Sequence, residues 1–589
     1  MASRERGRES LLVVAIDFGT SYSGYAYQFY NEFVNDPNKI GSPQAWNSGK
    51  SNLISLKTPT CLLLNQDKAL DECAFGYEAE ERYANLCLEQ ENEKYYFFRR
   101  FKMKLQEGEG LTKSSTIEDE TGKKMLALDV FALSIKCLKN HLMKMLEKQG
   151  TGVGEEDIFW VLTVPAIWND AAKQFMRKAA ILSGIKSDNL EIALEPEVAS
   201  IFCQHVPVSS ISSEGEQIQF AAAPPGTKYM VVDLGGGTAD ITVHEKLERG
   251  KLKEICKASG GPWGGTAVDN AFLQMLISIV GGPLMSRFMK EETYDYLDLF
   301  REFEAVKRNF SKRNKNKIVI KLPVTLNELC EEILGSNFKT CLAESVHSDE
   351  ISLRADKMII DPKLMDVLFR KATDPIIDHL CGILDKNSEN DISLILMIGG
   401  FSESPFVQDV IREAFHGKNG RKVVIPKDAG ITIVKGAVLF GRMPDTIDTR
   451  VLRFTYGVKR NPSFIKGVHP EEKKIVTDRG FQCKDVFDIL ISVDSNVKTG
   501  FSVEKSFCTL YDFQSNAILE VYYIKGKNPN FTTDLGCKLL GKVNVEIPEP
   551  SKGERWIDVT FQFGMTELKV CAAERSRNIS CTALFKLIE

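Results

Sequence analysis

Two short segments each place an aspartate at the end of an apolar run, with glycine and hydroxyl residues directly after it. They are Asp17-Phe-Gly19-Thr20-Ser21-Tyr22 and Asp233-Leu-Gly235-Gly236-Gly237-Thr238. Neighbouring glycines let backbone N–H groups converge on an anion, because no Cβ stands in the way. A carboxylate beside that anion can hold a hydrated magnesium ion. The pattern therefore predicts a site for phosphate and metal.

Each segment lies between two apolar runs, which is typical of a β-hairpin. One glycine-rich segment alone would fit an ordinary turn equally well. Two of them, more than two hundred residues apart, are too widely spaced for a solenoid repeat. We expect two related half-domains that face each other, each giving one hairpin to one nucleotide.

The two hairpins resemble the phosphate loops of the actin, sugar-kinase and heat-shock-seventy ATPase superfamily. Three further segments are similar to the heat-shock-seventy family, namely Val164-Pro-Ala-Ile-Trp-Asn-Asp170, Glu195-Pro-Glu197 and Gly264-Gly265. Glu304, Lys307, Arg308 and Ser311 follow the spacing of one helix face. A salt-bridged surface helix would show such spacing too, but the string resembles the family's adenosine-binding helix, which actin and sugar kinases lack. The chain is identified as similar to the heat-shock-seventy family, in its divergent "twelve" subgroup.

The resemblance implies a role for each matched residue. Asp17 and Asp233 would hold Mg²⁺ through water, while Glu195 and Thr238 position the attacking water. Lys102, with Lys104 as the alternative, would support the γ-phosphate. Phosphoryl transfer by positioning needs no covalent nucleophile. The nucleotide-binding residues would be Gly19, Thr20, Ser21, Tyr22, Gly235, Gly236, Gly237, Gly264, Gly265, Glu304, Lys307, Arg308, Ser311, Gly399, Gly400 and Phe401.

The chain departs from the family at the adenine side. Glu403 stands three residues after Gly400, where the family has an arginine that stacks on adenine. A carboxylate cannot make that cation–π contact, which leaves Phe401 as the aromatic side chain available there. Thr266 and Ala267 replace an acidic pair of the family.

From about Met443 onward, short alternating strands replace the helical periods, which is typical of a β-sandwich. Leu540-Gly-Lys-Val543 and Gly564-Met-Thr-Glu-Leu-Lys-Val570 are similar to the family's peptide-binding sandwich. Because the sequence stops at Glu589, we expect no helical lid. The linker after Met443 lacks the leucine-rich run that docks onto the ATPase lobe in typical family members, which argues against nucleotide-controlled peptide trapping. Clients bound by residues 446–589 would then dissociate quickly.

Composition limits the function classes further. The net charge of −5 over 589 residues predicts no nucleic-acid binding, and 43% hydrophobic content is ordinary for a globular protein. The apolar run before Asp17 is too short for a membrane span or a signal peptide, so we expect a cytoplasmic, possibly also nuclear, protein. Fourteen cysteines without a C-x-x-C pair predict reduced thiols.

The sequence thus predicts an α/β actin-like (ribonuclease-H-like) ATPase of two lobes over residues 1–445, split near 206–226. An all-β sandwich over residues 446–589 would follow. The expected ligands are ATP or ADP with Mg²⁺, and the expected function is slow ATP hydrolysis with chaperone-like client binding. Two alternatives stay open: an ATP-binding scaffold that does not hydrolyse, and a small-molecule kinase of the same superfamily.

Overall fold

The computed structural model describes residues 7–43, 46–47, 54–66, 73–105, 112, 114–205, 211–212, 223–313, 316–477, 480–509, 512–547, 549–575, 579–581 and 584–586. Most of the expected lobe divider at 206–226 lies outside the described residues. Within them, no single helix is long and apolar enough to cross a membrane. The bent pair α7 (Gly265–Val280) and α8 (Gly282–Glu291) meets that test only jointly, by length and composition.

The first lobe is built on a five-stranded sheet in the order β12-β11-β1-β2-β5. Its strands are β1 (Leu12–Phe18), β2 (Tyr22–Phe29), β5 (Thr58–Pro59), β11 (Ile158–Val164) and β12 (Leu190–Leu194). β1 pairs antiparallel with β2 and parallel with β11. Every residue of β1 is buried, because helices cover both faces of the sheet.

Successive side chains of β1 point to opposite faces of the sheet and therefore contact different helices. Leu12, Val14 and Ile16 join a core with α4 (Ala127–Lys148) and α5 (Asp170–Leu182). Val13 and Ala15 face the other way, towards α6 (Glu195–His205) and α14 (Thr432–Arg442). Successive strand residues point to opposite faces, so one apolar run serves both cores.

The second lobe repeats this arrangement around the sheet β13-β21-β20-β14-β15-β16-β22-β27. Its first six strands along the chain are β13 (Ile211–Ser212), β14 (Lys228–Leu234), β15 (Ala239–Lys246), β16 (Leu252–Gly261), β20 (Leu394–Ile398) and β21 (Lys422–Pro426). β14 pairs antiparallel with β15 and parallel with β20, as β1 does with β2 and β11. Helices α6 and α14 share a core with both sheets and lie between them. Each sheet thus holds one hairpin at an equivalent place, β1–β2 in the first lobe and β14–β15 in the second.

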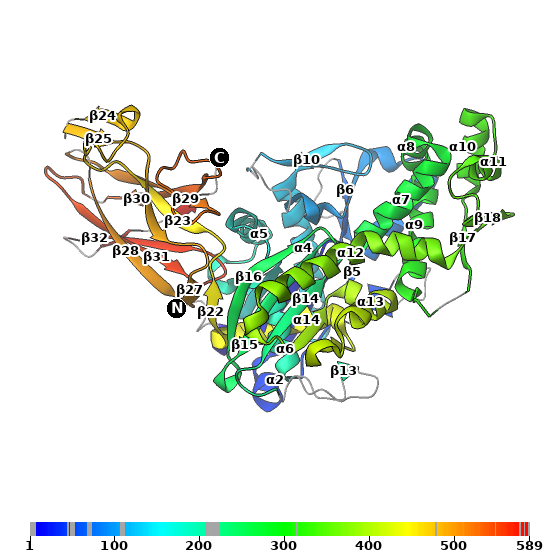
Figure 1. Cartoon of the computed structure of the whole chain (residues 1–589), viewed down its shortest axis with the longest axis horizontal. Coiled ribbons are helices and arrows are strands. Elements are labelled where there is room, and N and C mark those ends of the chain that lie inside the picture. The colour runs from blue at the N-terminus through cyan, green and yellow to red at the C-terminus, as the bar shows by residue number, and fades with distance from the viewer. Residues whose placement is uncertain are drawn as a thin grey trace.

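The outer parts of the two lobes are smaller units. The first lobe carries β6 (Cys61–Asn65), β7 (Ala74–Phe75), α3 (Tyr77–Leu88), β8 (Tyr95–Arg99), η3 (Phe101–Leu105), β9 (Thr116–Glu118) and β10 (Lys124–Leu126). The second carries α9 (Thr293–Asn309), β17 (Ile318–Lys321), α10 (Val324–Leu334), α11 (Phe338–Glu344), β18 (Ile351–Arg354), β19 (Lys357–Ile360), α12 (Pro362–Lys386) and α13 (Pro405–Phe415). α3 of the first lobe contacts α9 of the second. Figure 1 shows α8, α10, α11 and β18 at the end of the molecule opposite the C-terminal strands.

Most strands of the C-terminal part form two further sheets that share one hydrophobic core, and β24 (Lys474–Thr477) pairs with β25 (Gly480–Cys483) in a small sheet of their own. One holds β23 (Thr455–Arg460), β26 (Val486–Ile491), β29 (Asn516–Ile524), β30 (Lys538–Glu546) and β34 (Leu584–Lys586). The other holds β28 (Phe501–Cys508), β31 (Trp556–Phe563), β32 (Lys569–Glu574) and β33 (Ile579–Cys581). These strands form a separate group of elements beside the two lobes (Figure 1).

One strand joins this part to the second lobe. β22 (Ile447–Val451) pairs with β16 of that lobe, and β27 (Asn496–Lys498) pairs with β22 in turn. The large sheet therefore continues past residue 445, and the two parts are linked by backbone hydrogen bonds as well as by the chain itself.

Candidate functional site

The turns of the two central hairpins lie against each other. A Cβ on Gly236 would stand 2.2 Å from Ser21 Oγ, and one on Gly237 would stand 2.8 Å from Thr20 Oγ1. Glycine is therefore the residue that fits at both positions of the second turn. We call residues 19–21 the first loop and residues 235–237 the second loop.

The second loop is held from behind by the first turn of α7. The N–H groups of Gly264, Gly265 and Thr266 donate to the carbonyls of Gly237, Gly235 and Gly236 at 3.3, 3.1 and 2.7 Å. A Cβ on Gly264 would lie 2.6 Å from the Gly236 carbonyl, so a side chain there would force the two segments apart. The paired glycines thus brace the second loop, and their N–H groups are already used by its carbonyls.

Three carboxyl groups converge next to these loops. Asp17 and Asp233 are the next-to-last residues of β1 and β14, and Glu195 begins α6 directly after β12. Their residues are 3%, 3% and 7% exposed. They come from equivalent places in the two sheets, where strands run parallel and end on the same edge.

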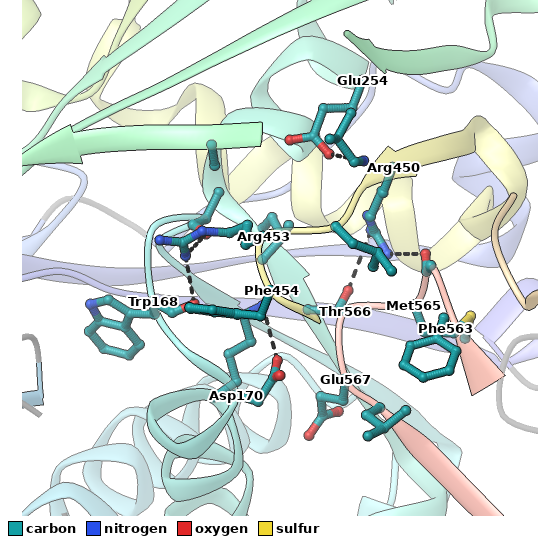
Figure 2. Close-up of a pocket in the computed structure, with 18 of the residues that line it drawn as sticks. Trp168, Asp170, Glu254, Arg450, Arg453, Phe454, Phe563, Met565, Thr566 and Glu567 are labelled. Atoms are coloured by element: carbon teal, nitrogen blue, oxygen red, sulfur yellow. Dashed lines mark hydrogen bonds and ion pairs between the residues drawn. The ribbon is translucent and has the colours of Figure 1, made fainter. Parts of the chain in front are cut away.

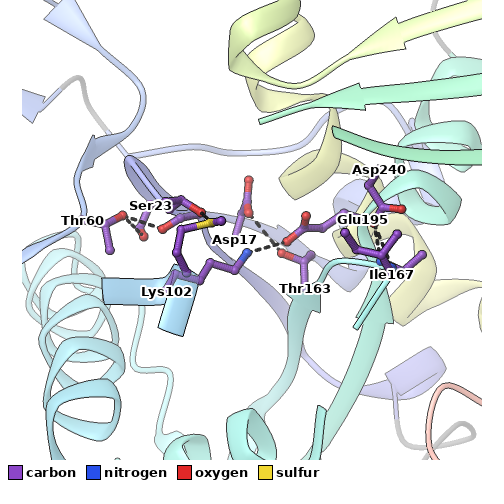
Figure 3. Close-up of polar contacts among 12 residues, drawn as sticks. Asp17, Ser23, Thr60, Lys102, Thr163, Ile167, Glu195 and Asp240 are labelled. Atoms are coloured by element: carbon purple, nitrogen blue, oxygen red, sulfur yellow. Dashed lines mark hydrogen bonds and ion pairs between the residues drawn. The ribbon is translucent and has the colours of Figure 1, made fainter. Parts of the chain in front are cut away.

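Cations and hydroxyls partly compensate this cluster (Figure 3). Lys57 Nζ lies 2.5 Å from Asp17 Oδ2, and Thr163 Oγ1 donates to Asp17 Oδ1 at 3.1 Å. Lys102 Nζ donates to Glu195 Oε1 at 2.9 Å. Lys102 is 4% exposed, whereas the alternative Lys104 is exposed on the same short helix η3. The structure thus brings Lys102, and not Lys104, to the carboxyl groups.

Asp233 and its neighbour Asp240 lack such compensation. Burial and the nearby Glu195, Asp240 and Asp17 raise the pKa of Asp233 well above its usual value. Burial, and then Glu195, raise the pKa of Asp240 to about 7, although the N–H groups of Ala166 and Ile167 bond its Oδ2. Burial and Asp17 also raise the pKa of Glu195, against the attraction of Lys102. Carboxyl groups gathered without enough positive charge hold protons.

This arrangement fits a hydrated divalent cation. Asp233 Oδ1 and Asp240 Oδ1 are buried and accept no hydrogen bond from the described residues. A buried carboxylate oxygen without a partner is costly, and a cation or its water ligands would remove that cost. No group of three or more His, Cys, Asp or Glu side chains among the described residues is arranged to ligate a metal directly. The two buried carboxylate oxygens are donors of the kind that a hydrated Mg²⁺ accepts.

Thr238 closes the second loop. Its carbonyl accepts a hydrogen bond from Gly235 N at 2.9 Å, and its side chain is partly exposed between β14 and β15. The residue thus lies at the turn that faces the first loop, beside the strand that carries Asp233.

The helix α9 carries an ion-pair network that reaches both lobes. Glu304 lies 2.6 Å from Lys307 and 2.8 Å from Arg308. Although burial opposes it, Lys307 and Arg308 lower the pKa of Glu304 to about 2. Lys307 Nζ also lies 2.5 Å from Asp269, and the Arg308 guanidinium lies 4.7 Å from the Tyr22 ring centre, in the first lobe.

The fourth residue of this motif, Ser311, does not continue the helix face. α9 ends at Asn309, and Phe310 leaves it with an extended backbone at φ −70° and ψ 134°. The Phe310 side chain is 4% exposed and packs near Phe369 and Phe406. Burial of this ring ends the helix, so the expected i, i+7 placement of Ser311 is wrong.

The glycine pair after β20 lies directly behind Asp233. Gly399 has φ +85°, and a Cβ there would stand 2.4 Å from Asp233 Oδ1. The Phe401 ring is only 7% exposed and belongs to the core of the second lobe, near Phe369. Glu403 Oε1 accepts the N–H of Gly430 at 2.8 Å. The side chain that replaces the family arginine thus caps a neighbouring turn, and Phe401 fills core space and presents no open face.

Two residues after Glu195, Glu197 ties α6 to the C-terminal part. Arg450 of β22 donates to both oxygens of Glu197 at 2.6 Å, and to the Gly564 carbonyl at 2.7 Å. Both ionic side chains are less than a tenth exposed. The bidentate pair crosses between the first lobe and the strand that follows the lobes.

A cavity of about 70 Å³ adjoins this pair, between the first lobe and the C-terminal sheets (Figure 2). Around it, Arg453 donates to the carbonyls of Ala166 and Trp168, both at 3.0 Å. Tyr456 donates to Asp170 at 2.7 Å. Residues 164–170 therefore contact two parts of the molecule. Their N–H groups donate to Asp240, and their carbonyls and Asp170 accept hydrogen bonds from the C-terminal part.

Several of these residues carried no signal in the sequence. Lys57 and Thr163 have no motif around them, and they meet Asp17 only through the fold. Asp240 does follow the glycine turn at a fixed spacing, two residues after Thr238, and this spacing could have pointed to it. Glu197 and Arg450, which are 253 residues apart, have no local sign of pairing.

Comparisons with known proteins give the family. The family model described as "Hsp70 protein" matches residues 94–580. The human "Heat shock 70 kDa protein 12B" is 34% identical over 97% of this chain and 90% of its own length. The mouse "Heat shock 70 kDa protein 12A" is 35% identical over 96% and 90%, and the "Chaperone protein DnaK" of Thermotoga petrophila is 25% identical over 74% and 61%. The chain belongs to the Hsp70 family, in the subgroup of the heat shock 70 kDa proteins 12A and 12B.

Proposed function

We propose that this protein binds ATP with Mg²⁺ between its two loops and hydrolyses it slowly. The observation that carries the proposal is the convergence of Asp17, Glu195 and Asp233 beside both loops, with a buried lysine at Glu195. Ionised carboxyl groups here would repel one another, and a divalent cation would balance their negative charge as well as that of the phosphate oxygens. Membership of the Hsp70 family supports the same ligands.

Each side chain has one task in this proposal. The bound Mg²⁺ supplies positive charge that balances the phosphate oxygens. Asp17 and Asp233 would hold it through water, and N–H groups of the two loops, other than that of Gly235, which bonds the Thr238 carbonyl, would contact the phosphates. Glu195 holds the attacking water with Thr238, and Lys102 changes its partner from Glu195 to the γ-phosphate.

The direct contact between the loops adds a requirement. Ser21 Oγ and the Gly236 backbone are too close to admit a phosphate between them. Binding therefore needs the two lobes to part slightly, about the α6 and α14 layer that both sheets share. The Arg308–Tyr22 contact spans the same two lobes, so it is expected to change on binding.

The test is single-turnover cleavage of ATP by the purified protein with Mg²⁺. Glu195→Gln and Asp233→Asn should each lower the cleavage rate by about 10²-fold or more, as expected when a positioning group is lost. Lys102→Ala should lower it too, whereas Lys104→Ala, on the same short helix, should not. Binding of a fluorescent ATP analogue to each variant separates loss of cleavage from loss of affinity. Equal rates in wild type, Glu195→Gln and Asp233→Asn would refute the assigned site.

A second function is favoured by one observation, the use of Glu403 to cap the Gly430 turn. Without an arginine at this place, adenine lacks the stacking partner that the family provides. This departure from the family favours a role other than ATP turnover. In this alternative the protein is a scaffold that binds ATP without cleaving it. Bound ATP that stays intact through many hours, with Mg²⁺ present, would select the scaffold.

For the C-terminal part we propose client or partner binding by an all-β sandwich. Its support is the shared core of the two sheets and a group of exposed apolar residues at one end, Ile465, Val468, Val476 and Phe481. Fluorescence anisotropy with an unfolded, labelled peptide tests this directly. Affinity that is unchanged by Val476→Ser and Phe481→Ser would place any binding elsewhere.

A further inference from the structure

Two thiols of the first lobe lie unusually close together. The sulfurs of Cys73 and Cys137 are 3.1 Å apart, about 1 Å more than a disulfide bond. Both are free cysteines, both are partly exposed, and 64 residues separate them along the chain. Nothing in the nucleotide site uses either sulfur.

We propose that Cys73 and Cys137 form a peroxide-sensitive pair that closes to an intramolecular disulfide. The geometry favours this because one sulfur needs to move only about 1 Å towards the other. Both residues pack against the core of the first lobe, which holds them side by side. The partial exposure of both residues gives a small oxidant access to them.

The two thiols have different chemical tasks. The hydrogen bond from Cys137 is the main cause that lowers the pKa of Cys73 to about 7, and Lys136 adds to it. The same contact, together with burial, raises the pKa of Cys137. Because the thiolate is the reactive form, Cys73 is the residue that attacks an oxidant first.

The reaction consumes one hydrogen peroxide. The Cys73 thiolate attacks one peroxide oxygen, the O–O bond breaks, and hydroxide leaves, so Cys73 becomes a sulfenic acid. The Cys137 sulfur then attacks the Cys73 sulfur, the S–O bond breaks and hydroxide leaves again. The two hydroxides take up the two thiol protons, so two thiols and one peroxide give one disulfide and two waters.

The disulfide would join two units of the first lobe. Cys73 directly precedes β7, which pairs with β6, and β6 pairs with β8. Cys137 lies on α4, which covers the central sheet. β8 leads into η3, which carries Lys102, so the bond would fasten the unit that holds this lysine to the body of the lobe.

The test is oxidation of the full-length protein with hydrogen peroxide, followed by denaturation, alkylation and peptide mapping by mass spectrometry. We expect loss of two alkylatable thiols from the fourteen of the chain, a crosslinked peptide holding Cys73 and Cys137, and full reversal by dithiothreitol. Cys137→Ser should stop the reaction at a Cys73 sulfenic acid that dimedone traps. Cys137→Ala is the alternative if serine disturbs the packing, and there the Cys73 sulfenic acid should form more slowly, because the hydrogen bond that lowers the pKa of Cys73 is lost.

Two controls separate proximity from general reactivity. Cys381→Ser removes an exposed cysteine on α12 and should leave the crosslink unchanged. Peroxide added to the protein in guanidinium chloride should not favour this pair, because the fold no longer holds the sulfurs together. A folded protein that gives no Cys73–Cys137 peptide, or that forms it no faster than other pairs, would overturn the proposal.

Discussion

Replacing Asp240 with asparagine should shift the stability of the ligand-free protein in favour of the variant as the pH rises from 5 to 8. The pKa of Asp240 rises from 3.8 to about 7 on folding, because the carboxyl is buried beside Glu195. A carboxyl with a raised pKa gives its full contribution to stability below pH 3.8. That contribution falls as the pH rises towards 7 and is lost above it.

The size of the effect follows from the shift. A change of about 3 pKa units corresponds to ~4 kcal/mol at pH 8, and the 1.2 units between pH 3.8 and pH 5 correspond to ~2 kcal/mol. The amide of the variant carries no charge but leaves a buried donor, which costs about 1–3 kcal/mol at every pH. The quantity to measure is the free energy of unfolding of the variant minus that of wild type. Between pH 5 and pH 8 this difference should rise by about 2–3 kcal/mol in favour of the variant.

Urea unfolding followed by tryptophan fluorescence provides the assay, since Trp160 and Trp168 lie in the core of the first lobe and Trp168 directly follows Ile167, whose N–H bonds Asp240. Asp378→Asn, which removes the charge of an exposed aspartate on α12, is the matched control and should show no such change with pH. Mg²⁺ with ATP should reduce the advantage of Asp240→Asn, because the ligand stabilises the ionised cluster. A difference that is constant with pH, or that favours wild type more at pH 8, would refute the reasoning.

Two further predictions concern packing and the junction. Gly399→Ala should lower the free energy of unfolding by at least about 1–3 kcal/mol, because the φ of +85° is strained for alanine and the new Cβ would stand 2.4 Å from Asp233 Oδ1. Gly400→Ala is the control, since a Cβ there has no atom within 4 Å. Equal melting temperatures of the two variants would contradict the prediction. Arg450→Leu should cost about 3–5 kcal/mol, because it leaves Glu197 charged and buried. Adding Glu197→Leu should restore much of that loss, and a double variant as unstable as the sum of the single ones would argue against a paired role.

The sequence predicted the parts of the site that depend on short stretches of chain. Both hairpins are correct, because an apolar run, a glycine turn and a second apolar run specify their own pairing. Asp17 and Asp233 come together because each ends an equivalent strand.

What the sequence did not predict depends on distant contacts. Ser311 was placed on α9 by spacing alone, but burial of Phe310 ends the helix before it. The boundary at 445 follows a change in strand pattern, yet backbone pairing of β22 with β16 crosses it. Periodicity reports which face of an element is buried, and it does not report which other element covers that face.

The start of α6 connects these two kinds of information. Glu195 points to the carboxyl groups between the lobes, and Glu197, two residues later in the same helical turn, meets Arg450 of the strand that continues into the C-terminal part. Residues two apart on a helix lie on different faces, so Glu195 and Glu197 can each keep their own partner although they share one helical turn. A movement of Arg450 that drew Glu197 with it would therefore rotate or shift Glu195 as well. Since Arg450 also holds the Gly564 carbonyl, any partner that displaces the 563–568 segment acts on the same ion pair. The carboxyl cluster and the C-terminal sheets thus meet at neighbouring residues of one helical turn.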